Sequence, residues 1–161
     1  MKRFFIVMVY INSYSTFWKE KELLYFVLAL ALMGQSVDST DVSILAAFRG
    51  FSSHDGFLRV AVFDSPEFWP EDKDNALLAL TFPVDGDVVT IDLSELSPGY
   101  YAIAAFHDKD GDAVFDRGLF GVPKERYGFS NGARSSTGPP DYEDALFLVT
   151  DEPLELEIVL E

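Results

Sequence analysis

The segment HDKDGDAVFD, residues 107–116, contains four aspartates at close and regular spacing. They are Asp108, Asp110, Asp112 and Asp116. Counted from Asp108, their carboxylates hold the first, third, fifth and ninth positions, and the backbone carbonyl of Val114 holds the seventh. Calcium loops place oxygen ligands at such alternate positions because the chain wraps around a hard cation that takes about six to eight of them. The spacing therefore predicts a Ca²⁺ site made of these four carboxylates and the Val114 carbonyl.

The same loop departs from an EF-hand, which leaves a second interpretation open. Its sixth position is Ala113 where an EF-hand needs glycine, its twelfth is Leu119 where an EF-hand has glutamate, and no helical pattern flanks it. A loop without helices can still take a ligand from elsewhere in the chain, and Glu125 is a candidate. Aspartate and glycine also favour turns in which side chains accept hydrogen bonds from nearby backbone amides. The loop is thus either a Ca²⁺ site or an acidic turn.

Other residues near this loop could also contribute chemistry. A lone histidine at a strand end, such as His107, more often forms structural hydrogen bonds than acts as a base. Asp108 and Glu125 could be the acid and base of a hydrolase, but carboxylates are abundant here and no G-x-S-x-G motif occurs. The segment YGFSN is expected to fold back beside the loop, where it would serve, with Glu125, as a loop anchor or ligand surface. Its side chains are Tyr127, Phe129, Ser130 and Asn131.

The composition limits the classes of protein to which the chain can belong. Its 161 residues, 48% of them hydrophobic, suffice for one domain with a core. The absence of cysteine excludes disulfides, thiolate metal sites, a thiol nucleophile and the acylated cysteine of a lipoprotein. Two histidines far apart in sequence argue against a multi-histidine zinc site. The candidate cofactor is Ca²⁺, which is favoured over Mg²⁺ because the ligands are all oxygens on a flexible loop.

Residues 1–36 contain two apolar runs that resemble export signals. FFIVMVYI follows Lys2 and Arg3, and LLYFVLALALM follows KEKE and precedes small residues. The second run has eleven residues, fewer than the roughly 20 that span a bilayer but typical of a signal-peptide h-region. We expect residues 1–36 to be a signal peptide, with an over-extended start or a long n-region, or else an uncleaved membrane anchor. In both cases the domain at 37–161 is expected to be periplasmic or secreted.

Removal of residues 1–36 would leave a strongly acidic domain. That segment holds four of the 12 basic and two of the 27 acidic residues, so 8 basic and 25 acidic residues remain, a formal charge of −17. Such a surface repels phosphate backbones and anionic lipid headgroups. We expect no nucleic-acid partner, contact with a membrane only through an uncleaved N-terminus, and a protein or glycan partner that the sequence does not identify.

From residue 43 onward, apolar residues alternate with period two in short segments separated by turn signals. The expected strands are 43–48, 57–64, 76–82, 88–93, 100–108, 144–149 and 154–160. This pattern predicts an all-β fold, an antiparallel sandwich of seven strands with one long loop. Loops longer than about 12–15 residues are usually functional or disordered, and apolar residues in the connection 108–143 favour a functional loop that packs on the sandwich. The expected core includes Val60, Val62, Ile91, Ile103, Phe147 and Ile158.

Several motifs in the second half of the chain form a pattern. They are a Pro-Gly turn, a Tyr-Ala strand ending in His-Asp, an aspartate-rich loop, G-x-P-K-E, Y-G-F-S-N and P-x-x-x-D-A. They fall at Pro98–Gly99, Tyr101–Ala102, His107–Asp108, Asp110–Asp116, Gly121–Glu125, Tyr127–Asn131 and Pro140–Ala145. This pattern resembles the exported bacterial family called domain of unknown function 2141, with Ala113 as a departure where that family usually has glycine. The resemblance implies a secreted or periplasmic immunoglobulin-like or transthyretin-like sandwich, similar to carboxypeptidase-regulatory-like modules, and implies no activity.

These features lead us to expect an exported, non-enzymatic binding or structural module whose aspartate loop binds Ca²⁺. The alternative is a carbohydrate or small-ligand binder that uses exposed aromatic residues such as Phe68, Trp69, Tyr127 and Phe129. With 15% aromatic content in a small sandwich, however, most aromatic side chains should belong to the core or its edges. A hydrolase ranks third.

Overall fold

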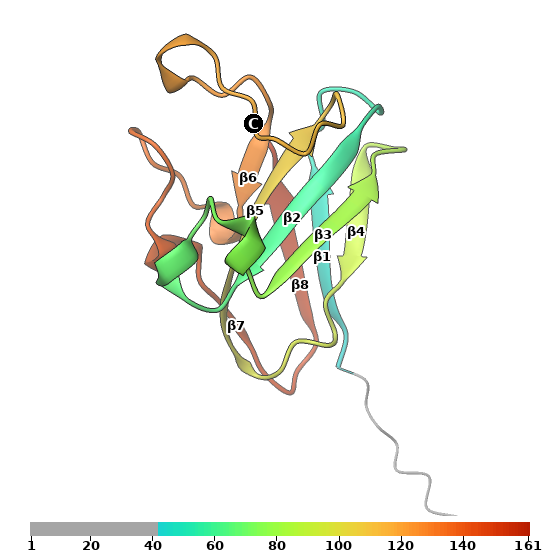
Figure 1. Ribbon diagram of the computed structural model, residues 1–161. Coiled ribbons are helices and arrows are strands. Elements are labelled where there is room, and N and C mark those ends of the chain that lie inside the picture. Colours follow the sequence, from blue (N-terminus) through green and yellow to red (C-terminus); the bar gives the residue numbers. More distant parts are fainter. Residues whose placement is uncertain (1–41) are drawn as a thin grey trace, which may run out of the picture. The chain divides into compact units, whose positions relative to one another are not determined.

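The alternating segments fold into strands that form two sheets (Figure 1). The computed structural model describes residues 42–161, which belong to one compact unit. The strands are β1 (Ile44–Arg49), β2 (Phe57–Phe63), β3 (Leu78–Pro83), β4 (Val88–Asp92), β5 (Gly99–Asp108), β6 (Tyr127–Phe129), β7 (Phe147–Val149) and β8 (Leu154–Val159). Five short 3-10 turns lie between them, at Pro66–Phe68 (η1), Lys73–Asn75 (η2), Leu119–Gly121 (η3), Ser130–Gly132 (η4) and Tyr142–Ala145 (η5). Within the described residues the fold is therefore all-β.

The two sheets differ in size and in how they are connected. The smaller has three strands in the order β4-β1-β8, and the larger has five, in the order β3-β2-β5-β6 with β7 paired to the start of β5. All strand pairs are antiparallel except β1 with β8, which run parallel with Phe48 opposite Ile158. β5 is the longest strand, and its last residue, Asp108, opens the aspartate loop.

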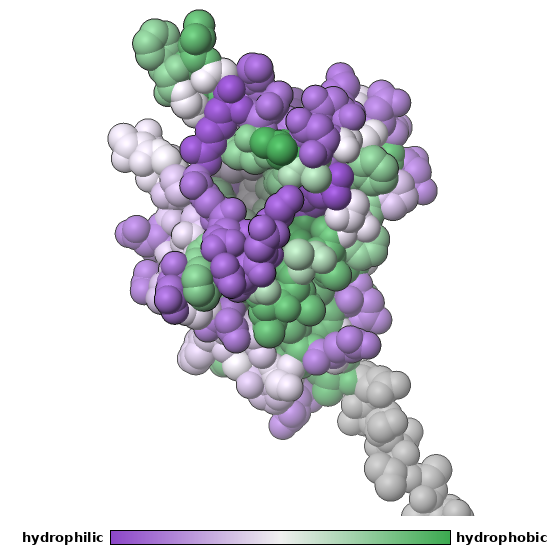
Figure 2. All heavy atoms as spheres, in the orientation of Figure 1, coloured by the Kyte–Doolittle hydropathy of each residue, from purple (hydrophilic) through white to green (hydrophobic). Residues whose placement is uncertain are grey.

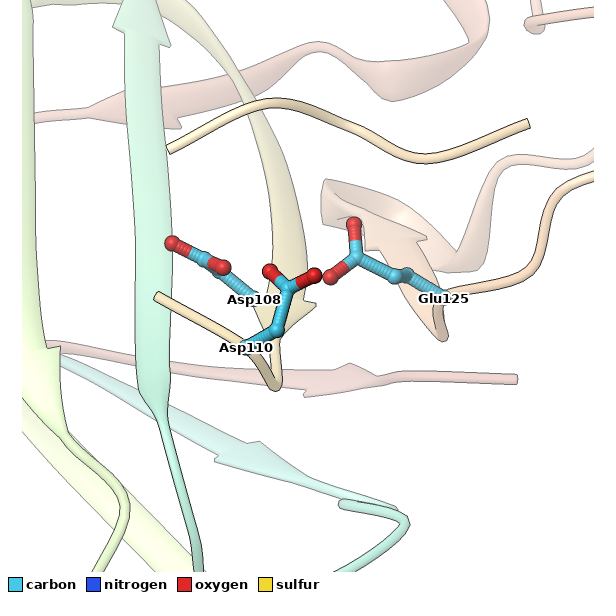
Figure 3. Close-up of side chains that lie close together, drawn as sticks. All are labelled: Asp108, Asp110 and Glu125. Carbon is cyan, nitrogen blue, oxygen red and sulfur yellow. The ribbon is translucent and has the colours of Figure 1, made fainter. Parts of the chain in front are cut away.

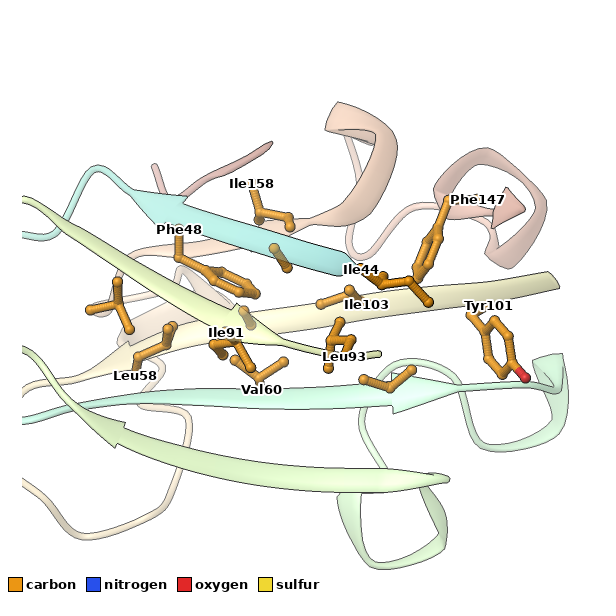
Figure 4. Packing of buried hydrophobic residues seen from close by; sticks show 14 of the residues in the cluster. Ile44, Phe48, Leu58, Val60, Ile91, Leu93, Tyr101, Ile103, Phe147 and Ile158 are labelled. Carbon is orange, nitrogen blue, oxygen red and sulfur yellow. The ribbon is translucent and has the colours of Figure 1, made fainter. Parts of the chain in front are cut away.

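The main hydrophobic core lies between the two sheets (Figure 4). Strands of the smaller sheet contribute Ile44, Phe48, Ile91 and Ile158, and strands of the larger sheet contribute Leu58, Val60 and Ile103. All six residues predicted for the core, Val60, Val62, Ile91, Ile103, Phe147 and Ile158, are buried. That part of the sequence prediction is confirmed, because strict alternation assigns each residue to one face of a strand.

Two parts of the predicted sandwich are wrong. There are eight strands instead of seven, because β6 has only three residues, one of them glycine, which is too short for an alternating pattern to emerge. The sandwich is also not fully antiparallel, because β1 and β8 pair in parallel. Tight turns impose antiparallel pairing only on consecutive strands, and these two come from opposite ends of the domain.

No helix in the described part of the chain is long and apolar enough to cross a membrane. The signal peptide or membrane segment predicted at residues 1–36 lies outside the described residues.

Candidate functional site

The carboxylate of Asp108 organises the start of the aspartate loop. The residue is 0% exposed, and Arg59 on the neighbouring strand β2 reaches its Oδ2 atom with Nε at 2.8 Å and Nη2 at 2.7 Å. The same oxygen accepts the backbone N–H of Ala113 at 3.0 Å, and Oδ1 accepts that of Gly111 at 2.8 Å. One buried carboxylate thus fixes the loop to the sheet.

These contacts keep Asp108 ionised. Burial alone would raise the pKa of its carboxyl, but the hydrogen bond from Arg59, those from the amides of Ala113 and Gly111, and the positive charge of Arg59 together hold that pKa below the ordinary value of 3.8. The guanidinium of Arg59 therefore balances the charge of Asp108.

The loop makes its sharp turn without the glycine of an EF-hand. Ala113 adopts φ of 64°, in the left-handed region that residues other than glycine seldom occupy, and Gly111 adopts φ of 79°. The hydrogen bond from the Ala113 amide to Asp108 supports this conformation. The missing glycine therefore does not prevent the loop from curling around the Asp108 carboxylate.

Three carboxylates gather at this loop (Figure 3). One oxygen each from Asp108, Asp110 and Glu125 lies within 4.8 Å of the others. The carboxylates of Asp110 and Glu125 face each other, whereas that of Asp108 is directed toward its partner Arg59 on β2. Glu125 also ties the two ends of the loop together, because its oxygens accept the amides of Lys109 at 3.2 Å and Asp116 at 3.0 Å.

The structure does not bring the predicted ligand set together as a whole. Among the described residues, the carboxylate group contains Asp108, Asp110 and Glu125 but neither Asp112 nor Asp116. Asp112 accepts the N–H of Val114 at 2.7 Å, and Asp116 lies 4.0 Å from the Lys124 ammonium. Alternate spacing does not make them converge, because each carboxylate follows its own local turn or ion pair.

His107 has a structural role, as its position at a strand end suggested. The ring is 1% exposed, its Nε2 lies 2.7 Å from the carbonyl oxygen of Asp55, and its Nδ1 lies 3.2 Å from the amide of Ser52. A carbonyl can only accept, so Nε2 carries the proton and Nδ1 accepts from Ser52. The edge of the ring contacts Phe51, with 5.3 Å between ring centroids. His107 thus joins the β1–β2 connection to the end of β5.

The YGFSN segment does anchor the long loop on the sheet. Tyr127 and Phe129 belong to β6, which pairs with β5, and Phe129 is buried. The hydroxyl of Ser130 is buried, donates to the carbonyl of Ala145 and accepts the amide of Ile103 at 2.8 Å. Asn131 donates to the carbonyl of Asp144 at 3.0 Å. Ser130 and Asn131 therefore hold the segment in place through hydrogen bonds to backbone groups.

The aromatic residues considered as a ligand surface pack mainly against one another. They join a second hydrophobic cluster on the five-stranded sheet, around Phe63, Phe129 and Tyr142. The Trp69 ring lies 5.4 Å from Phe129 and 5.8 Å from Tyr142, centroid to centroid, and its Nε1 donates to the Pro140 carbonyl at 2.9 Å. Phe68 and Tyr127 lie partly buried against the same cluster. These rings hold loops on the sheet.

The partner of Asp108, Arg59, could not be recognised from the sequence. Arg59 is one charged residue in the alternating segment FLRVAVFD, at a position where any polar side chain would suit a sheet face. Its role follows from register, because Arg59 lies opposite Phe106, two residues before Asp108 on the adjacent strand. Without the strand pairing, no sequence signal links the two.

The fold and site define a class of β-sandwich-like domain with a long loop fixed by a buried aspartate that pairs with a partly buried arginine. Residues 47–157 match the family described as "Uncharacterized protein conserved in bacteria (DUF2141)". The chain therefore belongs to this bacterial family, as the motifs around the aspartate loop indicated. Among curated proteins and solved structures, none matches the chain.

Proposed function

We propose that this protein is an exported, non-enzymatic binding or structural module whose aspartate loop takes up Ca²⁺. The observation that carries the proposal is the facing pair of Asp110 and Glu125 carboxylates beside Asp108. Two unit charges about 4 Å apart repel by about 4 kcal/mol at a protein-surface dielectric, and a cation between them turns this repulsion into attraction. All candidate ligands are oxygens, which suits a hard cation such as Ca²⁺.

The same geometry favours a weak site. The oxygens of Asp108 already accept hydrogen bonds from Arg59 and two backbone amides. Asp110 and Glu125 would therefore be the main protein ligands, and water would complete the coordination shell of the cation. Calcium sites of extracellular modules often have dissociation constants of about 10⁻⁴–10⁻³ M. Such a site matches the proposed location outside the cytoplasm, in the periplasm or the medium.

A role as a binding module has more support than the other two hypotheses. The carboxylates of Asp108 and Glu125, which a hydrolase would use as acid and base, accept backbone amides that shape the loop. A carbohydrate platform would need open aromatic faces, whereas the rings of Trp69 and Phe129 pack against each other at an interplanar angle of 53°. An immunoglobulin-like or transthyretin-like sandwich, which presents loops at its ends, is the finer fold class that we propose for such a module.

A pair of matched variants tests the Ca²⁺ proposal. Asp110→Asn removes a charge from the facing pair, and Asp112→Asn removes one from a neighbouring carboxylate outside the group. Asparagine keeps an oxygen that can accept a hydrogen bond, so both variants preserve the loop. At 10 mM CaCl₂, about 10–100 times the expected dissociation constant, the wild type should gain about 1.4–2.7 kcal/mol of unfolding free energy.

Calorimetric melts with CaCl₂, or with EDTA and NaCl at equal ionic strength, give the answer. The Ca²⁺-dependent rise in melting temperature should persist in Asp112→Asn and vanish in Asp110→Asn. If wild type and Asp110→Asn respond alike, the loop is an acidic turn and the proposal fails.

A further inference from the structure

A hairpin between Asp116 and Lys124 carries an apolar tip away from the sandwich. Leu119, Phe120 and Val122 are 84%, 101% and 61% exposed. In Figure 2 a green knob stands clear of the purple surface, at the place where Figure 1 draws the orange loop that precedes β6. Soluble proteins rarely leave neighbouring large apolar side chains so exposed without a binding role.

Backbone hydrogen bonds order the hairpin, and the residue with the aromatic ring at its tip, Phe120, is fully exposed. The amide of Gly118 donates to the carbonyl of Val122 at 2.7 Å, and that of Lys124 donates to Asp116 at 3.0 Å. Phe120 adopts φ of 67°, a left-handed conformation in which glycine would be the ordinary choice. Backbone strain of this kind in a fully exposed residue is typical of functional segments.

Charge around the hairpin determines which surface it can meet. Residues 118–123 carry no charge, and the two cations at the base, Arg117 and Lys124, lie beside Glu71 and Asp116. The described residues hold 23 acidic and 8 basic side chains, so anionic surfaces would repel the domain. Any attraction between the tip and another surface must therefore come from apolar contacts.

From this geometry we propose that the tip, residues 119–122, inserts into a bilayer of zwitterionic lipids. The knob is convex, and its apolar side chains are open on nearly every side. A folded protein surface would cover only part of such a knob, whereas fluid acyl chains surround it completely, and the ring of Phe120 suits the interfacial region. The proposal departs from the expectation that only an uncleaved N-terminus contacts a membrane, and the contact does not depend on Ca²⁺.

The absence of cysteine makes the insertion directly measurable in the full-length protein. Leu119→Cys, labelled with an environment-sensitive fluorophore, reports on the tip, and Val88→Cys, on a 54% exposed apolar residue of β4, is the matched control. The probe surface is phosphatidylcholine vesicles in EDTA, with and without a quencher attached to the acyl chains. Because the readout is local, vesicle binding by another part of the chain does not mimic it.

We expect the label at position 119 to shift to the blue and to be quenched from within the bilayer, while the label at position 88 does neither. Adding Phe120→Ser to Leu119→Cys should weaken this response at least tenfold, since burying a phenylalanine side chain corresponds to a tenfold or larger gain in partitioning. A label at 119 that stays in water on vesicles, or one shielded without lipid as protein concentration rises, overturns the proposal. The latter result would assign the tip to a protein interface.

Discussion

A single residue, Asp108, connects three parts of the domain. It is the last residue of β5, and its carboxylate binds Arg59 of β2 and accepts hydrogen bonds from two amides of the loop. Asp108 is fully buried, and the Arg59 side chain is 24% exposed. Removal of one member of a buried ion pair leaves an uncompensated charge, which typically costs about 3–5 kcal/mol. Partial exposure of Arg59 places the expected cost at the lower end of that range.

We predict that Arg59→Met loses about 3 kcal/mol of unfolding free energy near neutral pH and less in acid. The pKa of Asp108 in the folded protein lies below 3.8, so the pair's contribution is complete above that value and is lost as the pH falls through the folded pKa. Below it the wild type has lost the same interaction, so the two stability curves should converge. Urea unfolding followed by tryptophan fluorescence, at about pH 7 and about pH 3, measures the difference.

The exposed pair of Arg49 and Glu157 provides the control. Arg49→Met should cost less than about 1 kcal/mol at either pH, as expected for a solvent-exposed ion pair. An Arg59→Met deficit that is equal at both pH values would mean that Arg59 stabilises the protein by packing alone.

At the scale of single residues, only part of the site could be predicted from the sequence. The spacing of the aspartates and the YGFSN motif were visible in the sequence, and so was Glu125 as a distant carboxylate. The sequence did not show which of the aspartates would converge, because a nearby backbone amide engages Asp112 and the Lys124 ammonium lies beside Asp116. Which carboxylates converge depends on backbone dihedrals such as φ of Ala113, and composition does not determine these.

Among the elements, β6 shows how a short strand can hold two sheets together. It pairs with β5 in the larger sheet, and Tyr127 exchanges two backbone hydrogen bonds with Glu161, just after β8 of the smaller sheet. Gly128 makes this approach possible, because a Cβ atom at that position would lie 2.5 Å from the carbonyl oxygen of Val159. The position tolerates no side chain without movement of backbone.

We therefore predict that Gly128→Ala destabilises the domain by about 1–3 kcal/mol, the usual cost of overpacking. Gly86→Ala is the matched control, since nothing lies within 4 Å of a Cβ added there and its φ is not positive. That variant should keep or slightly raise the melting temperature, because alanine restricts the unfolded chain. Equal melting temperatures for the two variants would show that β6 can move away from β8 freely.

The sequence located the other seven strands; β7 is as short as β6, but it lies within a longer apolar run, residues 144–149, whereas β6 is interrupted by Gly128. Strand boundaries differ from the prediction where a turn forms instead of a strand. Residues 144–146 were expected in a strand, but β7 starts only at Phe147, after the 3-10 turn η5. β6 could be inferred only as a segment that folds back on the sheet, since three residues around Gly128 do not define a period.

At the scale of the whole molecule, the pairing of β1 with β8 joins the two ends of the domain within the smaller sheet. Such a contact depends on the global arrangement of the strands, so no local pattern could predict its parallel direction. The face-to-face core, in contrast, follows from alternation along every strand, which is why the core residues were predictable when this strand pairing was not.

The charge of the whole domain leads to a prediction about salt. Residues 42–161 carry a formal charge of −15, from 23 acidic and 8 basic side chains, and folding brings these charges closer together. Raising NaCl to about 0.15 M shortens the Debye length to about 8 Å, so it should weaken this repulsion and raise the melting temperature measured by calorimetry in EDTA. Exposed ion pairs such as Arg49–Glu157 lose little by comparison. The triple variant Asp85→Asn, Asp151→Asn, Glu155→Gln, all at exposed positions outside the aspartate loop, should reduce the salt response. A melting temperature that falls with NaCl would show that attractive pairs outweigh the net charge.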